Sequence, residues 1–214
     1  MKRIPFLTNQ EILRAIPEII KHLRANQAIA YPTETVYGFG SLIREDALQR
    51  VAELKDRVET KPFLLLVSNA AQCAQLEWNE PARKLAQAFW PGPLTLALRA
   101  TSGEFPQWVL SQNGTVAVRE TPHAGLRRLL DALNEPITST SANLPRSAPA
   151  SSADETAHAL ETKGAADVLL LDGGVLPPMK PSTLVDCSVN PVRILRHGAI
   201  PVDSLRKVVE QIDA

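Results

Sequence analysis

The chain has 214 residues, of which 44% are hydrophobic and 21% are charged. A chain of this length and composition can bury a substantial core without metal or disulfide cross-links, which excludes disordered, collagen-like and disulfide-scaffold proteins. Lysine plus arginine and aspartate plus glutamate each number 23, so the formal net charge is zero. We therefore do not expect a protein that binds nucleic acid mainly by neutralising many phosphates, and any anion site must be local.

The two cysteines, Cys73 and Cys187, lie far apart in the sequence, and neither has C-x-x-C or histidine-rich spacing beside it. This pattern predicts reduced thiols and no structural metal. No stretch approaches the ~18 uninterrupted apolar residues of a membrane span. These features predict a cytoplasmic protein.

The first third of the chain predicts two helices around a pair of strands. Apolar residues recur at helical spacing over residues 8–26, where Thr8 and Glu11 are placed as a capping box and Pro17 could break the helix. Residues 27–43 predict two strand-like stretches joined by a PTET turn. Residues 45–57 then predict a short helix whose last turn carries Lys55 and Arg57.

The rest of the chain alternates strands with helices. The apolar run at 62–68 is typical of a strand covered on both faces, which implies helices on both sides of a sheet. Further helices are predicted at 81–90, 123–134, 151–164 and from about 203, and further strands at 91–100, 114–120, 136–143, 167–174, 182–188 and 191–198. The alternation indicates an α/β protein, and the last three strands, which follow one another directly, indicate a mixed sheet.

The common glycine-rich and catalytic signatures are absent from the sequence. Neither the P-loop nor the Rossmann pattern occurs, and G-x-S-x-G and H-E-x-x-H are missing too. Polar residues stand instead where strands end or helices begin, and ligands of open α/β sheets collect at such edges. These residues are Thr33, Glu34, Thr35, Lys55, Arg57, Lys61, Arg119, Ser139, Thr140, Ser141, Asn143, Ser182, Thr183, Arg193 and Arg196.

Each of these groups has two interpretations that the residues alone leave open. Lys55 and Arg57 could simply complement the dipole at a helix C-terminus, or they could clamp a phosphate, with arginine binding two oxygens through its planar fork. The hydroxyls that precede Asn143 could serve a turn or a helix cap. Alternatively, Ser141 and Asn143 could hold a phosphate, a ribose or an amino-acid backbone.

Seven segments in order resemble the YrdC-like family of threonylcarbamoyl-adenylate synthases, over residues 10–200. They are YPTETVYGFG, the K-x-R of LKDRVETKP, WPGPLTLAL, VAVRETPH, STSAN, PSTLVD and ILRHG. The resemblance implies one YrdC-like α/β domain spanning residues 1–214, with a core over about 10–200 and a tail helix at 201–214. It also implies a twisted mixed β-sheet flanked by helices around a large concave cavity that is locally positive.

The resemblance further implies the reaction of ATP, L-threonine and bicarbonate to threonylcarbamoyl-AMP and pyrophosphate, with Mg²⁺ accompanying ATP. The product would serve the threonylcarbamoyladenosine modification of tRNA, so tRNA and the downstream threonylcarbamoyl-transfer proteins are implied partners. The family's K-x-R and S-x-N pairs fall on the expected catalytic residues Lys55, Arg57, Ser141 and Asn143. The implied threonine contacts are Thr33, Arg119 and Ser141, and the implied nucleotide contacts are Lys55, Arg57, Asn143, Ser151, Ser182 and Arg196.

Two other functions compete with this one. A non-catalytic YrdC-like protein could bind RNA or a nucleotide, although retention of both motif pairs favours the enzyme. A carbamoyl-transfer domain like that of hydrogenase maturation factors would use carbamoyl phosphate instead, and the sequence shows no fused acylphosphatase or zinc-finger-like segment that would favour it.

Overall fold

The computed structural model describes residues 1–56, 61–101, 105–143 and 147–213. Its helices are α1 (Asn9–Arg24), α2 (Glu45–Leu54), the 3₁₀ turn η1 (Ala70–Cys73), α3 (Glu80–Phe89), α4 (Ala124–Leu133), α5 (Ala153–Thr162) and α6 (Val202–Arg206). Its strands are β1 (Lys2–Pro5), β2 (Ile29–Pro32), β3 (Tyr37–Gly40), β4 (Leu64–Val67), β5 (Leu94–Arg99), β6 (Thr115–Glu120), β7 (Ile137–Ser141), β8 (Leu169–Asp172), β9 (Thr183–Asp186), β10 (Val192–Arg196) and β11 (Ile212–Asp213).

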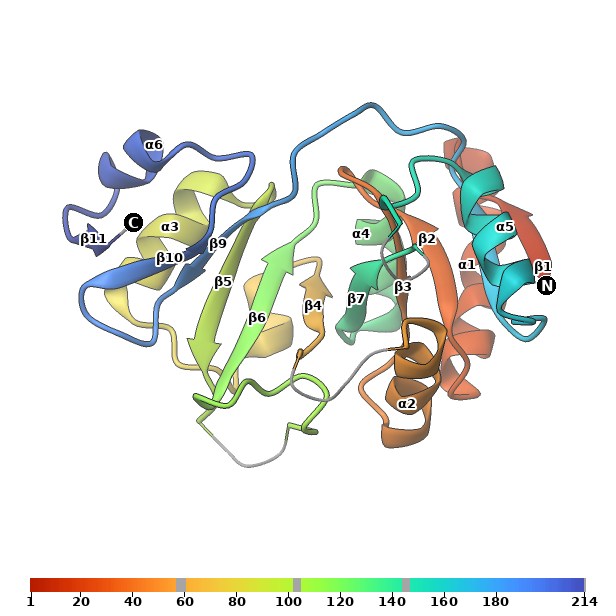
Figure 1. Cartoon of the computed structure of the whole chain (residues 1–214), viewed down its shortest axis with the longest axis horizontal. Helices are drawn as coiled ribbons and strands as arrows, with labels where there is room; N and C mark the ends of the chain where they lie inside the picture. Colours follow the sequence, from red (N-terminus) through yellow and green to blue (C-terminus); the bar gives the residue numbers. More distant parts are fainter. Residues whose placement is uncertain (57–60, 102–104, 144–146, 214) are drawn as a thin grey trace.

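Within the described residues, the strands form one hydrogen-bonded sheet in the order β1-β8-β2-β3-β7-β4-β6-β5-β9-β10-β11. The sheet contains both parallel pairs, such as β4 with β6, and antiparallel pairs, such as β3 with β7. This confirms the predicted mixed α/β sheet. The sheet runs along the long axis of the molecule, from β1, α1 and α5 at one end to α3, α6 and β11 at the other (Figure 1).

Alternate residues of the central strands enter two separate hydrophobic cores, because neighbouring side chains of a strand point to opposite faces. In β2, Ile29 and Tyr31 pack with the apolar sides of α1 and α4. Ala28 and Ala30 enter the other core, which α2, α3 and α5 help to cover. The sheet is thus covered by helices on both faces, as the apolar run in β4 predicted.

Side chains cap the N-termini of both α1 and α5, and of these two helices α1 has the complete capping box. Thr8 and Glu11 form the predicted capping box of α1, in which Glu11 N donates to Thr8 Oγ1 at 3.3 Å and Thr8 N donates to Glu11 Oε2 at 2.8 Å. At α5, Ser152 caps the helix by accepting from Glu155 N at 3.2 Å. The Glu155 side chain, however, accepts from Ser151 N at 2.7 Å rather than completing the box with Ser152.

Three local features differ from the sequence-based expectations. Helix α1 runs through Pro17 without a break, because both of its ends are capped or packed and its apolar side is buried against α4. Strand β1 was not predicted, since four residues give too short a pattern, and it pairs with β8. The expected tail helix is confined to α6 and is followed by β11, which pairs with β10.

Neither cysteine of the chain is at the surface. Cys73 and Cys187 are buried free thiols. Among the described residues, no helix combines the length and the apolar character that a membrane crossing requires.

Candidate functional site

Lys55, Ser141 and Asn143 come together although 86 residues or more separate Lys55 from the other two. Lys55 is the C-cap residue of α2, and its ammonium donates to the Asn143 backbone oxygen at 3.0 Å and to Asn143 Oδ1 at 2.5 Å. Ser141, the last residue of β7, donates to the same Oδ1 at 2.7 Å. The Lys55 side chain therefore does more than complement a helix dipole, because it reaches the loop that follows β7.

The loop after β7 folds back onto the start of β3. Ala142 N donates to Tyr37 O at 2.7 Å, and Ala150 N donates to Ala142 O at 2.9 Å. Asn143 Nδ2 donates to Ser147 O at 2.7 Å. The two ends of this loop are thereby held beside β3, while residues 144–146 lie outside the described part of the chain. Arg57, the second member of the K-x-R pair, also lies outside it.

Thr33 shapes the turn between β2 and β3. Its hydroxyl accepts from Thr35 N at 3.1 Å and from Val36 N at 3.2 Å, and donates to Val36 O at 2.6 Å. The Thr33 hydroxyl is therefore bonded within its own turn. The turn leads directly into Tyr37, which connects it to the loop after β7.

Arg119 of β6 is buried, with 4% of its surface exposed, and forms an ion pair with Glu34 of that turn. The Arg119 Nη1 and Glu34 Oε1 atoms are 3.1 Å apart, but this contact lacks the alignment of a hydrogen bond, because Glu34 Oε1 is buried without a hydrogen-bond partner. Arg119 Nε is also buried without a hydrogen-bond partner. A buried guanidinium with an unsatisfied N–H is costly in a folded protein unless a ligand completes it. Arg119 is therefore suited to bind a carboxylate or a phosphate.

Arg196 and Ser182 form a third polar group. Arg196, at the end of β10, donates through Nη2 to Ser182 Oγ at 2.9 Å and through Nε to Ser182 O at 3.1 Å, and Ser182 Oγ lies 2.8 Å from Thr95 Oγ1. Burial lowers the pKa of Arg196, and the positive charge of Arg119 lowers it further. The two guanidinium groups therefore interact electrostatically.

The structure places the predicted residues in three neighbouring groups. Lys55, Ser141 and Asn143 form the first, Thr33 and Arg119 flank Glu34 in the second, and Ser182 and Arg196 form the third. Ser151 lies just after the loop that folds back on β3, where its hydroxyl donates to Glu155 Oε2 at 3.1 Å. The predicted roles of these residues in binding and catalysis stay predictions.

Sequence reasoning assigned no role to Glu34 or Thr95, although each contacts a predicted site residue. Glu34 was noticed only as part of a polar turn. Its partner Arg119 is on a strand far along the chain, so local spacing carries no signal of the ion pair. The pattern that could have indicated it is a charged residue directly after an apolar run, as Arg119 follows Val116, Ala117 and Val118 in β6.

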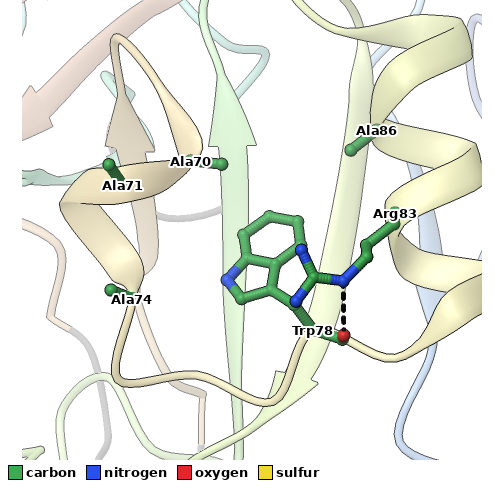
Figure 2. A pocket seen from close by; sticks show the side chains of 6 residues that line it. All are labelled: Ala70, Ala71, Ala74, Trp78, Arg83 and Ala86. Carbon is green, nitrogen blue, oxygen red and sulfur yellow. Dashed lines mark hydrogen bonds between the residues drawn. The ribbon is translucent and has the colours of Figure 1, made fainter.

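Two surface hollows lie away from these groups. One, of about 460 Å³, lies between η1 and α3 and is lined by Trp78, Arg83 and four alanines; Arg83 Nε donates to Trp78 O at 2.9 Å (Figure 2). The other, of about 330 Å³, is lined by residues that include Arg44 and Glu135. We assign the site by its buried, unsatisfied and positively charged groups, because these point to a ligand more directly than an open hollow lined by alanines.

A family model named Sua5_yciO_yrdC, described as telomere recombination, matches residues 21–198. The chain belongs to the Sua5/YciO/YrdC family. The threonylcarbamoyl-AMP synthase of Vibrio campbellii is 31% identical over 191 residues, which cover 87% of this chain and all of that protein. The enzyme of the same name from Pyrococcus abyssi is 34% identical over 193 residues, covering 89% of this chain but only 56% of the relative, so this chain spans about half the length of that relative.

The fold agrees with this family membership. A crystal structure of P. abyssi Sua5 complexed with L-threonine superposes with a TM-score of 0.90 at 31% identity, covering 100% of this chain and 62% of that one. The family match, the sequence relatives and the fold therefore all confirm the resemblance that the seven segments indicated.

Proposed function

We propose that this chain is an L-threonylcarbamoyladenylate synthase, which makes threonylcarbamoyl-AMP and pyrophosphate from ATP, L-threonine and bicarbonate. The observation that carries the proposal is the buried Arg119, whose Nε has no hydrogen-bond partner in the described structure. This guanidinium offers a place for the carboxylate of an amino acid. The relatives' names and the threonine complex of P. abyssi Sua5 support the choice of threonine.

The proposed chemistry requires no nucleophile from the protein. The threonine amine attacks the carbon of bicarbonate, and loss of water gives a carbamate. A carbamate oxygen then attacks the α-phosphorus of ATP, and the bond to the bridging oxygen of the β-phosphate breaks as pyrophosphate leaves. The protein contributes orientation and compensation of phosphate charge, which dominate such reactions.

The side chains of the three groups suit this task. Lys55 and Arg196 provide positive charge to bind phosphate oxygens. Ser141, Asn143 and Ser182 provide hydrogen bonds that orient the substrates. The cysteines do not compete as nucleophiles, since burial raises the pKa of each thiol to about 12. Arg57 joins the phosphate-binding residues in this proposal through its place in the K-x-R pair.

Mg²⁺ enters the proposal as the companion of ATP. Among the described residues, no group of three or more histidine, cysteine, aspartate or glutamate side chains is placed to hold a metal ion. The carboxylate beside the proposed site, Glu34, is paired with Arg119. The donor set thus fits phosphate-bound Mg²⁺, whose ligands are mainly phosphate oxygens and water, rather than a cage of protein carboxylates.

The proposal includes a cytoplasmic location and use of the product for threonylcarbamoyladenosine in tRNA. The neutral net charge gives little support to tight, sequence-independent RNA binding. We therefore propose that tRNA meets this product through the downstream threonylcarbamoyl-transfer proteins.

Incubation with ¹³C-bicarbonate, L-threonine and Mg-ATP, followed by mass spectrometry, tests the function. We expect labelled threonylcarbamoyl-AMP together with an equal amount of pyrophosphate, and no product when any one substrate is omitted. The same incubation with carbamoyl phosphate in place of bicarbonate and threonine tests the alternative that the chain is a carbamoyl-transfer domain. A nucleotide- or RNA-binding protein without activity would bind ATP or RNA but form no labelled product, which would overturn the proposal.

A further inference from the structure

Glu34 is the charged residue that contacts Arg119 in the described structure, and it does so from a rigid turn. Its side chain is 12% exposed and that of Arg119 is 5% exposed, so the ion pair is largely shielded from water. The hydroxyl of Thr33 bonds two backbone N–H groups and one carbonyl of the turn that carries Glu34. The position of the Glu34 backbone is therefore set by the turn and does not depend on Arg119.

The second oxygen of Glu34 is held by a different element. Thr121, which follows β6, donates from Oγ1 to Glu34 Oε2 at 3.4 Å and accepts from His123 N at 3.2 Å. The Glu34 side chain thus connects its own turn to the segment after β6. A carboxylate anchored at both its backbone and its far oxygen can hold the guanidinium of Arg119 in one orientation.

The nitrogen atoms of Arg119 that Glu34 contacts determine which of its nitrogen atoms can still bind a ligand. A guanidinium offers two edges for bidentate binding of a carboxylate, one made by the two terminal nitrogens and the other by Nε with one terminal nitrogen. Glu34 approaches Nη1, while Nε has no hydrogen-bond partner within the described residues. The ion pair therefore occupies the Nη1 side of the guanidinium and leaves Nε for a ligand.

Charge balance gives Glu34 a second effect. Burial is the main cause of the lowered pKa of Arg196, and the positive charge of Arg119 contributes to it. The negative charge of Glu34 offsets this repulsion at Arg119 and allows both cations to stay in one site. A neutral residue at position 34 would leave a buried guanidinium facing another cation without compensation.

We propose that Glu34 is a positioning residue that orients the Nε edge of Arg119 toward the carboxylate of the amino-acid substrate. This inference rests on the proposed function. It predicts that Glu34 controls the affinity for threonine through the carboxylate of threonine and has little effect on the affinity for ATP. If Glu34 had a purely structural role, replacing it would weaken the binding of both substrates together or would lower only the stability of the protein.

The test compares Glu34→Gln with the matched control Glu135→Gln, which removes the charge from a surface ion pair with Arg44 at 2.8 Å. Calorimetry measures binding of L-threonine and of L-threoninol, which lacks the carboxylate, and steady-state kinetics gives KM for ATP. For Glu34→Gln we expect a Kd for threonine raised at least about tenfold, as loss of a charge-assisted contact implies. We expect the preference for threonine over threoninol to shrink and KM for ATP to stay within about twofold, while Glu135→Gln matches the wild type in every measurement.

Glu34→Asp provides a second test if the Glu34→Gln variant does not fold. It keeps the negative charge but shortens the side chain toward Arg119 by one methylene. We expect it to fold and to weaken threonine binding by a smaller factor than Glu34→Gln. If the wild-type chain forms product while both Glu34 variants bind threonine as the wild type does, the positioning role is wrong and the proposed function stands. If the wild-type chain neither binds threonine nor forms product, the proposed function fails and this inference fails with it.

Discussion

The contact between Lys55 and Asn143 offers a direct test of whether distant residues converge as described. The Lys55 ammonium donates to Asn143 Oδ1 at 2.5 Å, and all three members of the group are partly buried. A hydrogen bond to a charged group contributes about 1.5–3 kcal/mol, and partial exposure places this one near the lower end because water replaces the lost partner. Lys55→Met or Asn143→Ala alone should therefore lower the free energy of unfolding by about 1.5 kcal/mol, which for a chain of this size lowers Tm by about 3–6 °C.

A double-mutant cycle separates the contact from other effects of each substitution. Chemical denaturation of the wild type, the two single variants and the double variant should give a coupling energy of about 1 kcal/mol, since the double variant loses the same bond only once. Both single variants should also reduce threonylcarbamoyl-AMP formation at least about 100-fold, because loss of orientation is costly for a reaction that depends on positioning. Additive destabilisation within about 0.5 kcal/mol, or product formation near the wild-type rate, would contradict the geometry on which the site is built.

Three further predictions concern other parts of the chain. Arg57→Ala should abolish most threonine- and bicarbonate-dependent pyrophosphate release while the protein stays folded; release at the wild-type rate would remove Arg57 from the phosphate-binding residues. Burial lowers the pKa of His123 below its usual 6.5 although Glu34 opposes the shift, and its ring caps α4 by accepting from Leu126 N at 3.2 Å. The unfolded chain therefore takes up a proton before the folded one does, so stability should fall as pH drops below about 6.5 and stay level above it. His123→Asn, which keeps a capping side chain, should reduce this slope in denaturation curves at pH 5.5 and 7.5, and an unchanged slope would assign it to other groups. Gly40→Ala should destabilise by about 3 kcal/mol, because a Cβ there would lie 1.9 Å from the backbone oxygen of Thr138; a Tm within 2 °C of the wild type, by the size scaling of Tm shifts, would contradict the close approach of β3 to β7.

The elements with strong periodicity could be predicted from the sequence. Strand β4 is an uninterrupted apolar run, and the structure places Leu66 in one core and Leu65 and Val67 in the other, as a strand covered on both faces requires. The capping box of α1 was also recognisable from Thr8 and Glu11. These features depend on residues close in sequence, so local chemistry determines them.

The features that sequence reasoning missed depend on residues far apart. Strand β1 exists because β8, more than 160 residues later, provides its hydrogen-bonding partner. The strand order of the sheet, in which β7 lies between β3 and β4, has no local signal either. The Glu34–Arg119 pair depends on the same tertiary arrangement, because it joins the β2–β3 turn to β6.

The candidate site was found from motif resemblance rather than from periodicity. The S-x-N pair begins at the last residue of β7 in a pattern that would suit an ordinary turn, and the bond from Ser141 to Asn143 Oδ1 is itself local. Only the contact with Lys55, 88 residues away, distinguishes this turn from a structural one. The fold thus supplies the information that separates the two interpretations of these residues.

A crystal structure of this chain with L-threonine and a non-hydrolysable ATP analogue would show whether the three groups bind both substrates. We expect threonine's carboxylate on the Nε edge of Arg119, with the triphosphate contacting Lys55 and the end of β7. Ligands bound instead in the hollow beside Trp78, or an Arg119 side chain that contacts neither ligand, would contradict this expectation.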